Sequence, residues 1–270
     1  MVYSYLLGIL YHSDTKGSIT MEEQLLQNRF IELAERSYNS GCYTYTNFLN
    51  LMELDMLSRM ESRLRHVPHT LWGGAEDCER KLVRFGNHEM CGYEEESPIA
   101  CIRIQAVNAK FADALTHRDF LGAIMNLGIE REMIGDIRVV EATGYVFCLN
   151  RIASFLIEQL TKVRHTTVAC EIVQALPETA TISTQSISLQ VTSERLDAVL
   201  AHLYQLSRTD AQELFRGGRI FVNDRMQESC SYAPKAGDVV SARGYGRFLY
   251  CGVSGKTKKG KLTVCVKRYV

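Results

Sequence analysis

The sequence lacks the features that mark membrane proteins and nucleotide-dependent enzymes. No apolar run reaches the length that crosses a membrane. The short apolar opening has no basic flank and no small-residue cleavage site, which argues against a signal peptide. The sequence has neither a G-x-G-x-x-G motif nor a phosphate loop, so nothing supports binding of a nucleotide or methyl donor. We therefore expect a cytoplasmic protein without a cofactor, a membrane contact or a small-molecule substrate.

Paired metal-binding and disulfide patterns are absent as well. The nine cysteines are odd in number and form no C-x-x-C pair. Several lie in apolar stretches such as residues 145–148, so we expect free thiols that pack as small hydrophobic side chains in a reducing cytosol. His66 and His69 are separated by a proline and have no third ligand nearby, which predicts a loop rather than a metal site.

The chain has no net charge, but the balance hides an asymmetry. Residues 183–270 carry 14 Lys and Arg against 7 Asp and Glu, whereas residues 1–182 carry 17 against 24. We therefore expect a polyanion to bind preferentially to the C-terminal part. The length of 270 residues allows two or three domains, and 46% hydrophobic residues indicate a folded protein.

The N-terminal part has a helical pattern. Thr20 can cap a helix that begins at Met21 with acidic residues in its first turn, and Gly41 can end it. A second helical pattern follows, so residues 21–67 predict a pair of amphipathic helices. Residues 1–20 are predicted to be an extension, and we hypothesise that Met21 is the natural start, which an intact-mass measurement would test. Residues 68–98 are predicted to be a connector with a short helical stretch near residues 76–85.

The middle part predicts an ordered series of strands and helices. Residues 99–173 alternate between the two periodicities in the order strand-helix-strand-strand-helix-strand, the ferredoxin-like split arrangement. Many RNA-recognition domains share this order, and so do many unrelated proteins. The Lys/Arg-Gly-Phe/Tyr signature of RNA-recognition domains is absent.

A polar linker separates the middle part from the end of the chain. Residues 175–188 are rich in Thr, Ser and Gln, and an edge strand is expected at residues 188–192. The whole chain therefore predicts an α+β protein. Its expected parts are an extension, a helical region with connector, a ferredoxin-like RNA-binding domain, a linker and a basic C-terminal domain. Their bounds are residues 1–20, 21–98, 99–174, 175–188 and 189–270.

The C-terminal part predicts two short helices followed by strands. Ser193 can cap the first helix and Ser207 the second. On the second helix, Arg208, Gln212 and Arg216 recur every four residues and so share one face. Two glycines end this helix. A strand is expected at residues 219–222 with a turn after it at residues 223–224, and a second strand at residues 239–243 with a turn before it at residues 236–238.

This pattern resembles the S4 RNA-binding domain, also called the alpha-L motif. The resemblance covers about 50 residues in fixed order, which makes it specific. It implies that the helix pair and the following loop form a basic surface that docks onto folded RNA. The residues that carry it are Arg195, Leu196, Asp197, Ser207, Arg208, Ala211, Gly218, Arg219, Val222, Asn223, Lys235, Gly237 and Asp238.

Arginine suits such a surface because a guanidinium donates two parallel hydrogen bonds to a phosphate and keeps its charge. Phosphate contacts position RNA, and specificity then comes from its shape. Tyr245 either stacks on a base or packs inward within a turn, and both alternatives stay open. The residues that we predict to contact RNA are Arg195, Ser207, Arg208, Gln212, Arg216, Arg219, Asn223, Lys235, Arg243, Tyr245, Arg247, Lys256, Lys258 and Lys259.

A wider resemblance links residues 21–268 to the bacterial YlmH family. It is carried by residues 117–123, 127–131, 134–137 and 243–248. It implies a helical N-terminal part, a middle RNA-binding-like domain and a C-terminal S4 domain with a short β extension. It also implies a factor that binds ribosomal RNA and tRNA on the large ribosomal subunit and acts on stalled ribosomes.

Two alternatives remain at this point. The first is an RNA-modifying enzyme that uses the S4 domain for targeting, although the middle domain lacks synthase or methyltransferase motifs. His117-Arg118-Asp119 resembles a kinase catalytic loop, but the other kinase motifs are absent. The second alternative is a scaffold for cell-division proteins, which no residue pattern supports. We expect a non-catalytic RNA-binding protein.

Overall fold

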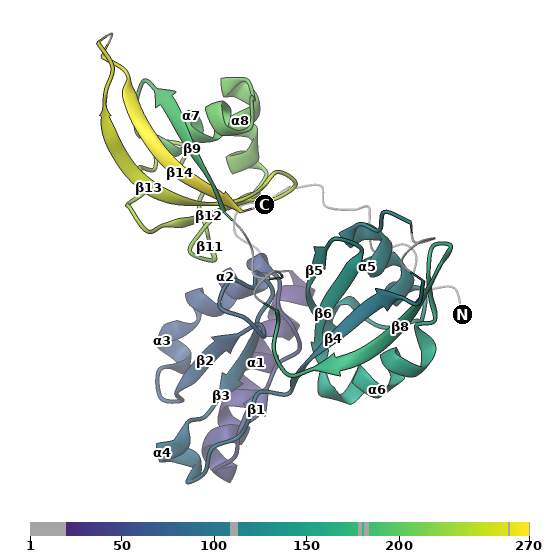
Figure 1. The fold of residues 1–270 in the computed structure, drawn as a ribbon. Coiled ribbons are helices and arrows are strands. Elements are labelled where there is room, and N and C mark those ends of the chain that lie inside the picture. The colour runs from purple at the N-terminus through teal and green to yellow at the C-terminus, as the bar shows by residue number, and fades with distance from the viewer. Residues whose placement is uncertain (1–19, 109–112, 178–179, 181–183, 259, 270) are drawn as a thin grey trace.

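The structure, a computed structural model, describes residues 20–108, 113–177, 180, 184–258 and 260–269. The predicted extension lies outside this range apart from Thr20, as does Lys259. The described chain forms an N-terminal, a middle and a C-terminal unit, each built around its own sheet (Figure 1). Within the described residues, no helix combines the length and the hydropathy that a membrane crossing requires.

The N-terminal unit begins with the predicted helix. The Thr20 hydroxyl accepts a hydrogen bond from the Glu23 amide at 3.2 Å, and the Glu23 carboxylate accepts one from the Thr20 amide at 2.8 Å. This reciprocal cap fixes the first turn. Gly41 ends the helix with φ +59°, as predicted. The helices of this unit are α1 (Met21–Ser40), α2 (Leu51–Arg59), α3 (Glu61–Leu64) and α4 (His88–Cys91).

A small sheet replaces the predicted connector. Its strands run in the order β1-β3-β2. Leu82, Val83 and Phe85 are fully buried, so the apolar run that we predicted as helical forms the central strand instead. Because a short apolar run fits a buried strand as well as a helix, periodicity alone could not decide. The strands are β1 (Thr44–Tyr45), β2 (His69–Trp72) and β3 (Leu82–Phe85).

The middle unit has the predicted order of elements. Its antiparallel sheet runs β5-β6-β4-β8-β7, with the short β7 as an addition. Helices α5 and α6 pack on one face through a core that includes Ile102, Phe120, Ile124 and Leu156. The elements are β4 (Ile99–Ala106), α5 (His117–Met125), the 3-10 turn η2 (Arg131–Met133), β5 (Ile134–Val140), β6 (Thr143–Leu149), α6 (Asn150–Gln159), β7 (Lys162–Val163) and β8 (Thr166–Val173).

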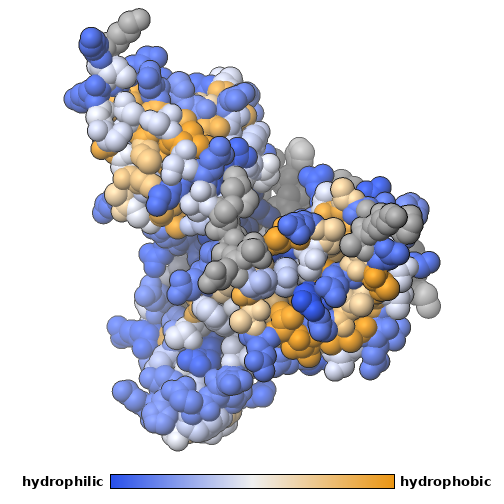
Figure 2. All heavy atoms as spheres, in the orientation of Figure 1, coloured by the Kyte–Doolittle hydropathy of each residue, from blue (hydrophilic) through white to orange (hydrophobic). Residues whose placement is uncertain are grey.

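The other face of this sheet is covered by the N-terminal unit. Tyr145 and Phe147 on β6 are buried in a cluster with Phe48 and Leu82. Figure 2 shows apolar surface gathered over the middle unit on the viewed face, and Phe155 is an exposed large hydrophobic residue of α6. The aromatic residues Tyr145 and Phe147 of β6 are thus packed inside the protein.

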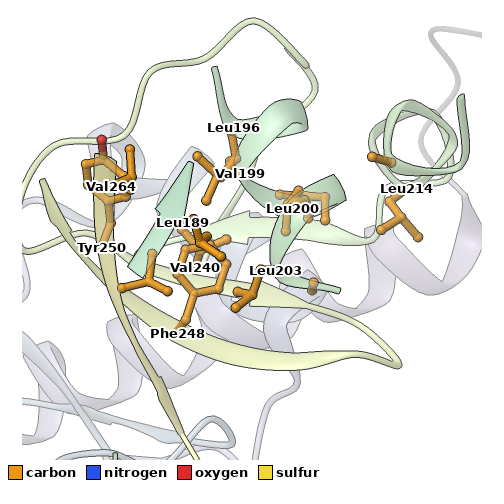
Figure 3. Packing of buried hydrophobic residues seen from close by; sticks show 14 of the residues in the cluster. Leu189, Leu196, Val199, Leu200, Leu203, Leu214, Val240, Phe248, Tyr250 and Val264 are labelled. Carbon is orange, nitrogen blue, oxygen red and sulfur yellow. The ribbon is translucent and has the colours of Figure 1, made fainter. Parts of the chain in front are cut away.

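The C-terminal unit folds around the two predicted helices. Its sheet runs β11-β10-β12-β13-β14-β9, and Figure 3 shows leucine and valine side chains of the helices packed against Phe248 and Tyr250 of the sheet. The elements are β9 (Thr184–Val191), α7 (Leu196–Leu203), α8 (Arg208–Arg216), β10 (Ile220–Val222), β11 (Arg225–Met226), β12 (Val239–Ala242), β13 (Gly246–Lys256) and β14 (Leu262–Tyr269).

One expectation for this unit needs correction. The strand β9 begins at Thr184, so part of the predicted linker is an edge strand that pairs with β14 from Thr184↔Tyr269 to Val191↔Leu262. The lysine-rich end of the chain forms the long hairpin β13–β14, which projects from the unit in Figure 1. Pairing of β9 with the distant strand β14, which local composition does not reveal, orders this part of the predicted linker.

The C-terminal unit docks on the N-terminal unit through α2 and β11. The Asp55 carboxylate accepts a hydrogen bond from the Met226 amide at 2.8 Å. Phe221 is fully buried in the N-terminal core, and Lys81 forms an ion pair with Asp224. These contacts hold the two units together.

Candidate nucleic-acid interface

A buried carboxylate organises the helix pair of the C-terminal unit. Asp197 is inaccessible to solvent and accepts two hydrogen bonds from the Arg195 guanidinium, at 3.0 and 2.9 Å. Gln212 donates to the same carboxylate at 3.3 Å, and the Nε of Arg208 lies 3.7 Å away. Burial alone would raise the pKa of Asp197, but these hydrogen bonds and positive charges outweigh it and lower that pKa.

This carboxylate changes how the predicted RNA ligands are arranged. Arg195 and Gln212 are oriented by Asp197, a partner that the sequence analysis did not anticipate. Arg208 stays 62% exposed, and Arg216 at the other end of α8 is exposed as well. The Ser207 hydroxyl accepts a hydrogen bond from the Asp210 amide at 3.1 Å and so caps α8, as predicted. Helix α8 therefore presents two guanidinium groups from a rigid frame.

Arg219 connects the end of α8 to the turn before β13. Its guanidinium donates to the Arg243 carbonyl at 2.6 Å, and the Arg243 amide donates to the Arg219 carbonyl at 2.9 Å. The same guanidinium lies over the Tyr245 ring, 5.7 Å from its centroid. Tyr245 is half-buried and its ring centroid is 5.4 Å from that of Tyr204, so the structure favours inward packing over base stacking.

Asn223 and Asp238, two residues that carry the S4 resemblance, build a turn. Asn223 has φ +50° and its side-chain amide donates to the Asp238 carboxylate at 2.9 Å, while its side-chain oxygen accepts from the Val239 amide. The Asp238 carboxylate also accepts from the Lys235 amide at 2.8 Å. Burial would raise the pKa of Asp238, but these hydrogen bonds lower it. The Asn223 side chain is thus engaged within the protein, whereas Lys235 is exposed.

Arg247 faces the N-terminal unit. Its guanidinium donates to the Asp77 carbonyl at 2.7 Å and lies 5.2 Å from the Tyr269 ring centroid. Its Nε is 4.0 Å from the Glu79 carboxylate, and only 15% of the side chain is exposed. Arg247 therefore joins two units and has little exposed surface, and its predicted contact with RNA stays a prediction.

The hairpin β13–β14 supplies the remaining predicted cations. Lys256 and Lys258 are exposed near its tip, and Lys261 follows them. Lys259 lies outside the described residues. No pairing in the described structure involves the ammonium groups of these three exposed lysines. They extend the basic surface beyond the helix pair.

Family models match the middle and C-terminal units. A model described as the putative RNA-binding domain in YlmH matches residues 94–176, and an S4 domain model matches residues 194–240. The ribosome-associated protein quality control protein P2 of Bacillus subtilis (strain 168) is 30% identical over 231 residues, which are 83% of this chain and 86% of that protein. The chain belongs to the YlmH family. The resemblance inferred from the sequence is thereby confirmed.

A solved structure is also similar to this YlmH-family chain. It is described as cell division protein YlmH from Streptococcus pneumoniae, with 20% identity and a TM-score of 0.46. The similarity covers 59% of this chain and 96% of that one.

The sheet of the middle unit lacks, within the described residues of β6, the exposed aromatic side chains on which RNA-recognition sheets stack bases. Stacking of bases on a sheet requires accessible aromatic rings, and Tyr145 and Phe147 are 8% and 3% exposed. The Asp119 carboxylate accepts hydrogen bonds from the Thr116 amide and hydroxyl at 2.8 and 2.7 Å, so the kinase-like triplet begins a capped helix. Among the residues described, no group of three His, Cys, Asp or Glu side chains could hold a metal ion.

The cysteines behave as predicted. All nine are free. Burial raises the pKa of Cys148 to about 12 and that of Cys78 to about 11, which keeps both thiols protonated and unreactive.

Proposed function

We propose that this protein binds structured RNA without catalysing a reaction, and that it acts on the large ribosomal subunit during quality control of stalled translation. The relative from Bacillus subtilis is named for ribosome-associated quality control, which supports the ribosomal setting. The S4 domain supports RNA as the ligand. The proposed partners are ribosomal RNA and tRNA, and the proposed location is the cytoplasm.

One observation carries the proposal. Arg208 and Arg216 are exposed at the two ends of a single face of α8, and that helix is anchored to α7 through Asp197. A fixed helix presents its guanidinium groups at a set spacing, and the planar guanidinium loses less side-chain freedom for each hydrogen bond to a phosphate than an ammonium does. The exposed lysines of the hairpin β13–β14 enlarge this surface. We call Arg208, Arg216 and the exposed lysines Lys256, Lys258 and Lys261 the S4 basic surface.

The units have separate proposed roles. We propose that the domains follow the expected bounds, with β9 assigned to the C-terminal domain. The S4 basic surface supplies RNA affinity. The middle domain, whose sheet face is covered, contacts RNA through other surfaces or positions the S4 domain.

Co-sedimentation with large ribosomal subunits tests this proposal. The variant Arg208→Glu/Arg216→Glu reverses two exposed charges. It removes the ion pair between Arg208 and Asp197 but leaves the hydrogen bonds to Asp197 from Arg195 and Gln212, so its folding is checked by circular dichroism. We expect the wild-type protein to pellet with the subunits and the variant to stay in the supernatant. The matched control Arg29→Glu/Arg36→Glu reverses two exposed charges on α1 and should pellet normally. Pelleting of the folded Arg208→Glu/Arg216→Glu variant at the wild-type level would refute the proposal.

A further inference from the structure

A cavity of about 380 Å³ lies where the three units meet. The N-terminal unit contributes Arg80, the middle unit contributes Arg131 and Arg138, and the C-terminal unit contributes Arg243 and Arg247. We call this space the junction cavity. It lies beside the turn in which Arg243 and Arg219 exchange backbone and side-chain hydrogen bonds. Arg243 thus connects the junction cavity to Arg219, which follows the end of α8 in the chain.

Positive charge predominates in the junction cavity. Five arginines line it against two carboxylates, those of Glu79 and Asp136. The Asp136 carboxylate is already engaged, because it accepts hydrogen bonds from the amides of Glu79 and Arg80 at 2.7 and 3.0 Å. An excess of cations in a concave, partly desolvated space concentrates anions.

Two of these arginines lack a carboxylate partner within the described residues. None of the ion pairs found there includes Arg80 or Arg131, and both guanidinium groups donate to backbone carbonyls, including that of Ile134. Burial and then the nearby Arg80 charge lower the pKa of Arg131 to about 10. Burial and the Arg131 charge also lower the pKa of His117, which lines the same space. An anion bound between the Arg80 and Arg131 guanidinium groups would offset their mutual repulsion.

The cavity wall also holds donors without acceptors. The Nε–H groups of Arg138 and Arg247 are buried, and neither donates a hydrogen bond within the described part of the chain; the carboxylate near the Arg247 Nε, that of Glu79, lies 4.0 Å away, beyond hydrogen-bond distance. The Arg138 side chain is 6% exposed and is fixed by an ion pair with Asp77. A buried N–H without an acceptor is unfavourable by about 1–3 kcal/mol, so these two donors indicate a place for an oxygen-rich ligand.

We propose that the junction cavity holds one phosphate group of the RNA that lies on the S4 basic surface. This inference rests on the proposed function and deepens it. An RNA backbone that passes the end of α8 reaches Arg219 and then Arg243, whose exposed side chain stands at the cavity. A phosphate there contacts guanidinium groups from all three units and so couples RNA binding to their relative orientation.

The first test uses inorganic phosphate and the full chain. Arginine Nε–H resonances are followed by NMR while sodium phosphate replaces sodium chloride at constant ionic strength. We expect saturable shifts at Arg247 and Arg138, with one dissociation constant. The variant Arg243→Gln keeps the backbone contacts of residue 243 and should weaken phosphate binding at least about tenfold, since a hydrogen bond between charged groups is strong. The control Arg36→Gln on α1 should bind phosphate normally. Absence of saturable shifts in the wild type would overturn the proposal.

The second test identifies the source of the phosphate. RNA affinity is measured in phosphate and in chloride at equal ionic strength. If the RNA supplies the phosphate, inorganic phosphate should weaken RNA binding to the wild type, and Arg243→Gln should remove this competition. A different result would be saturable NMR shifts with phosphate while phosphate leaves RNA affinity unchanged. That result would show that the cavity binds a free phosphate compound, and it would overturn the proposal that the RNA supplies the phosphate. The proposed function is tested independently of the cavity, because it is refuted if the Arg208→Glu/Arg216→Glu variant retains RNA binding.

Discussion

At the scale of single residues, Asp197 has the largest structural effect on the proposed RNA-binding surface. It is a buried carboxylate in a domain that carries a net positive charge, and it accepts hydrogen bonds from Arg195, Gln212 and the Ala198 amide. The sequence analysis identified Asp197 only as one residue of the S4 resemblance. Its partners lie up to 15 positions away on another helix, so its role depends on how the helices pack.

Replacing Asp197 with Asn should destabilise the protein and alter its acid sensitivity. Losing the charged acceptor should lower the free energy of unfolding by about 1–3 kcal/mol. The native pKa of Asp197 lies below its unfolded value. Its stabilisation is therefore present above the unfolded pKa, near 4, and is lost as pH falls through the lower native pKa.

Urea unfolding across the range from pH 7 to about pH 3 checks this expectation. The wild type should lose stability more steeply below about pH 4 than Asp197→Asn does. The control Asp210→Asn changes an exposed carboxylate on the same helix pair and should leave the slope unchanged. Equal slopes for the wild type and Asp197→Asn would contradict the role assigned to Asp197.

At the scale of elements, local patterns predicted the helices better than the sheets. Thr20, Gly41 and Ser207 mark helix ends in the sequence and do so in the structure. The β1-β3-β2 sheet and the start of β9 could not be predicted, because their partners lie far along the chain. The docking of Arg247 on Asp77, 170 positions away, was unpredictable for the same reason.

The hairpin β13–β14 should contribute to RNA affinity through charge alone. Changing Lys256, Lys258 and Lys261 to Gln should weaken binding to all RNA sequences alike. The slope of log affinity against log salt should become shallower by about 2–3 units, because each neutralised phosphate contributes nearly one unit to that slope. Because the side chains are exposed, the melting temperature should change little. Filter binding at several salt concentrations measures the affinity and its slope, and an unchanged slope would remove the hairpin from the interface. The triple variant Arg29→Gln/Arg36→Gln/Arg63→Gln is the control.

At the scale of the whole molecule, the C-terminal unit is attached to the N-terminal unit by a buried aromatic side chain and several polar contacts. Phe221 lies within the N-terminal core, and Asp55 accepts a hydrogen bond from the Met226 amide. The order of the S4 elements was predictable from the sequence. The attachment to the N-terminal unit was not, because the residues of one unit do not show which surface of another unit they contact.

Replacing Phe221 with Ala should loosen this attachment. Loss of a fully buried phenyl ring lowers stability by about 3–5 kcal/mol. We expect differential scanning calorimetry to show the C-terminal unit melting apart from the rest, with two transitions in the variant. The control Phe155→Ala removes an exposed ring and should retain the wild-type profile. A Phe221→Ala variant that melts with the wild-type profile would show that Phe221 does not join the units.

A cryo-EM reconstruction of the protein on native large ribosomal subunits tests the central claim most directly. We predict that the guanidinium groups of Arg208 and Arg216 lie within hydrogen-bond distance of RNA phosphates, about 2.7–2.9 Å. A reconstruction in which α8 faces solvent or a ribosomal protein, while other surfaces contact the RNA, would contradict the account.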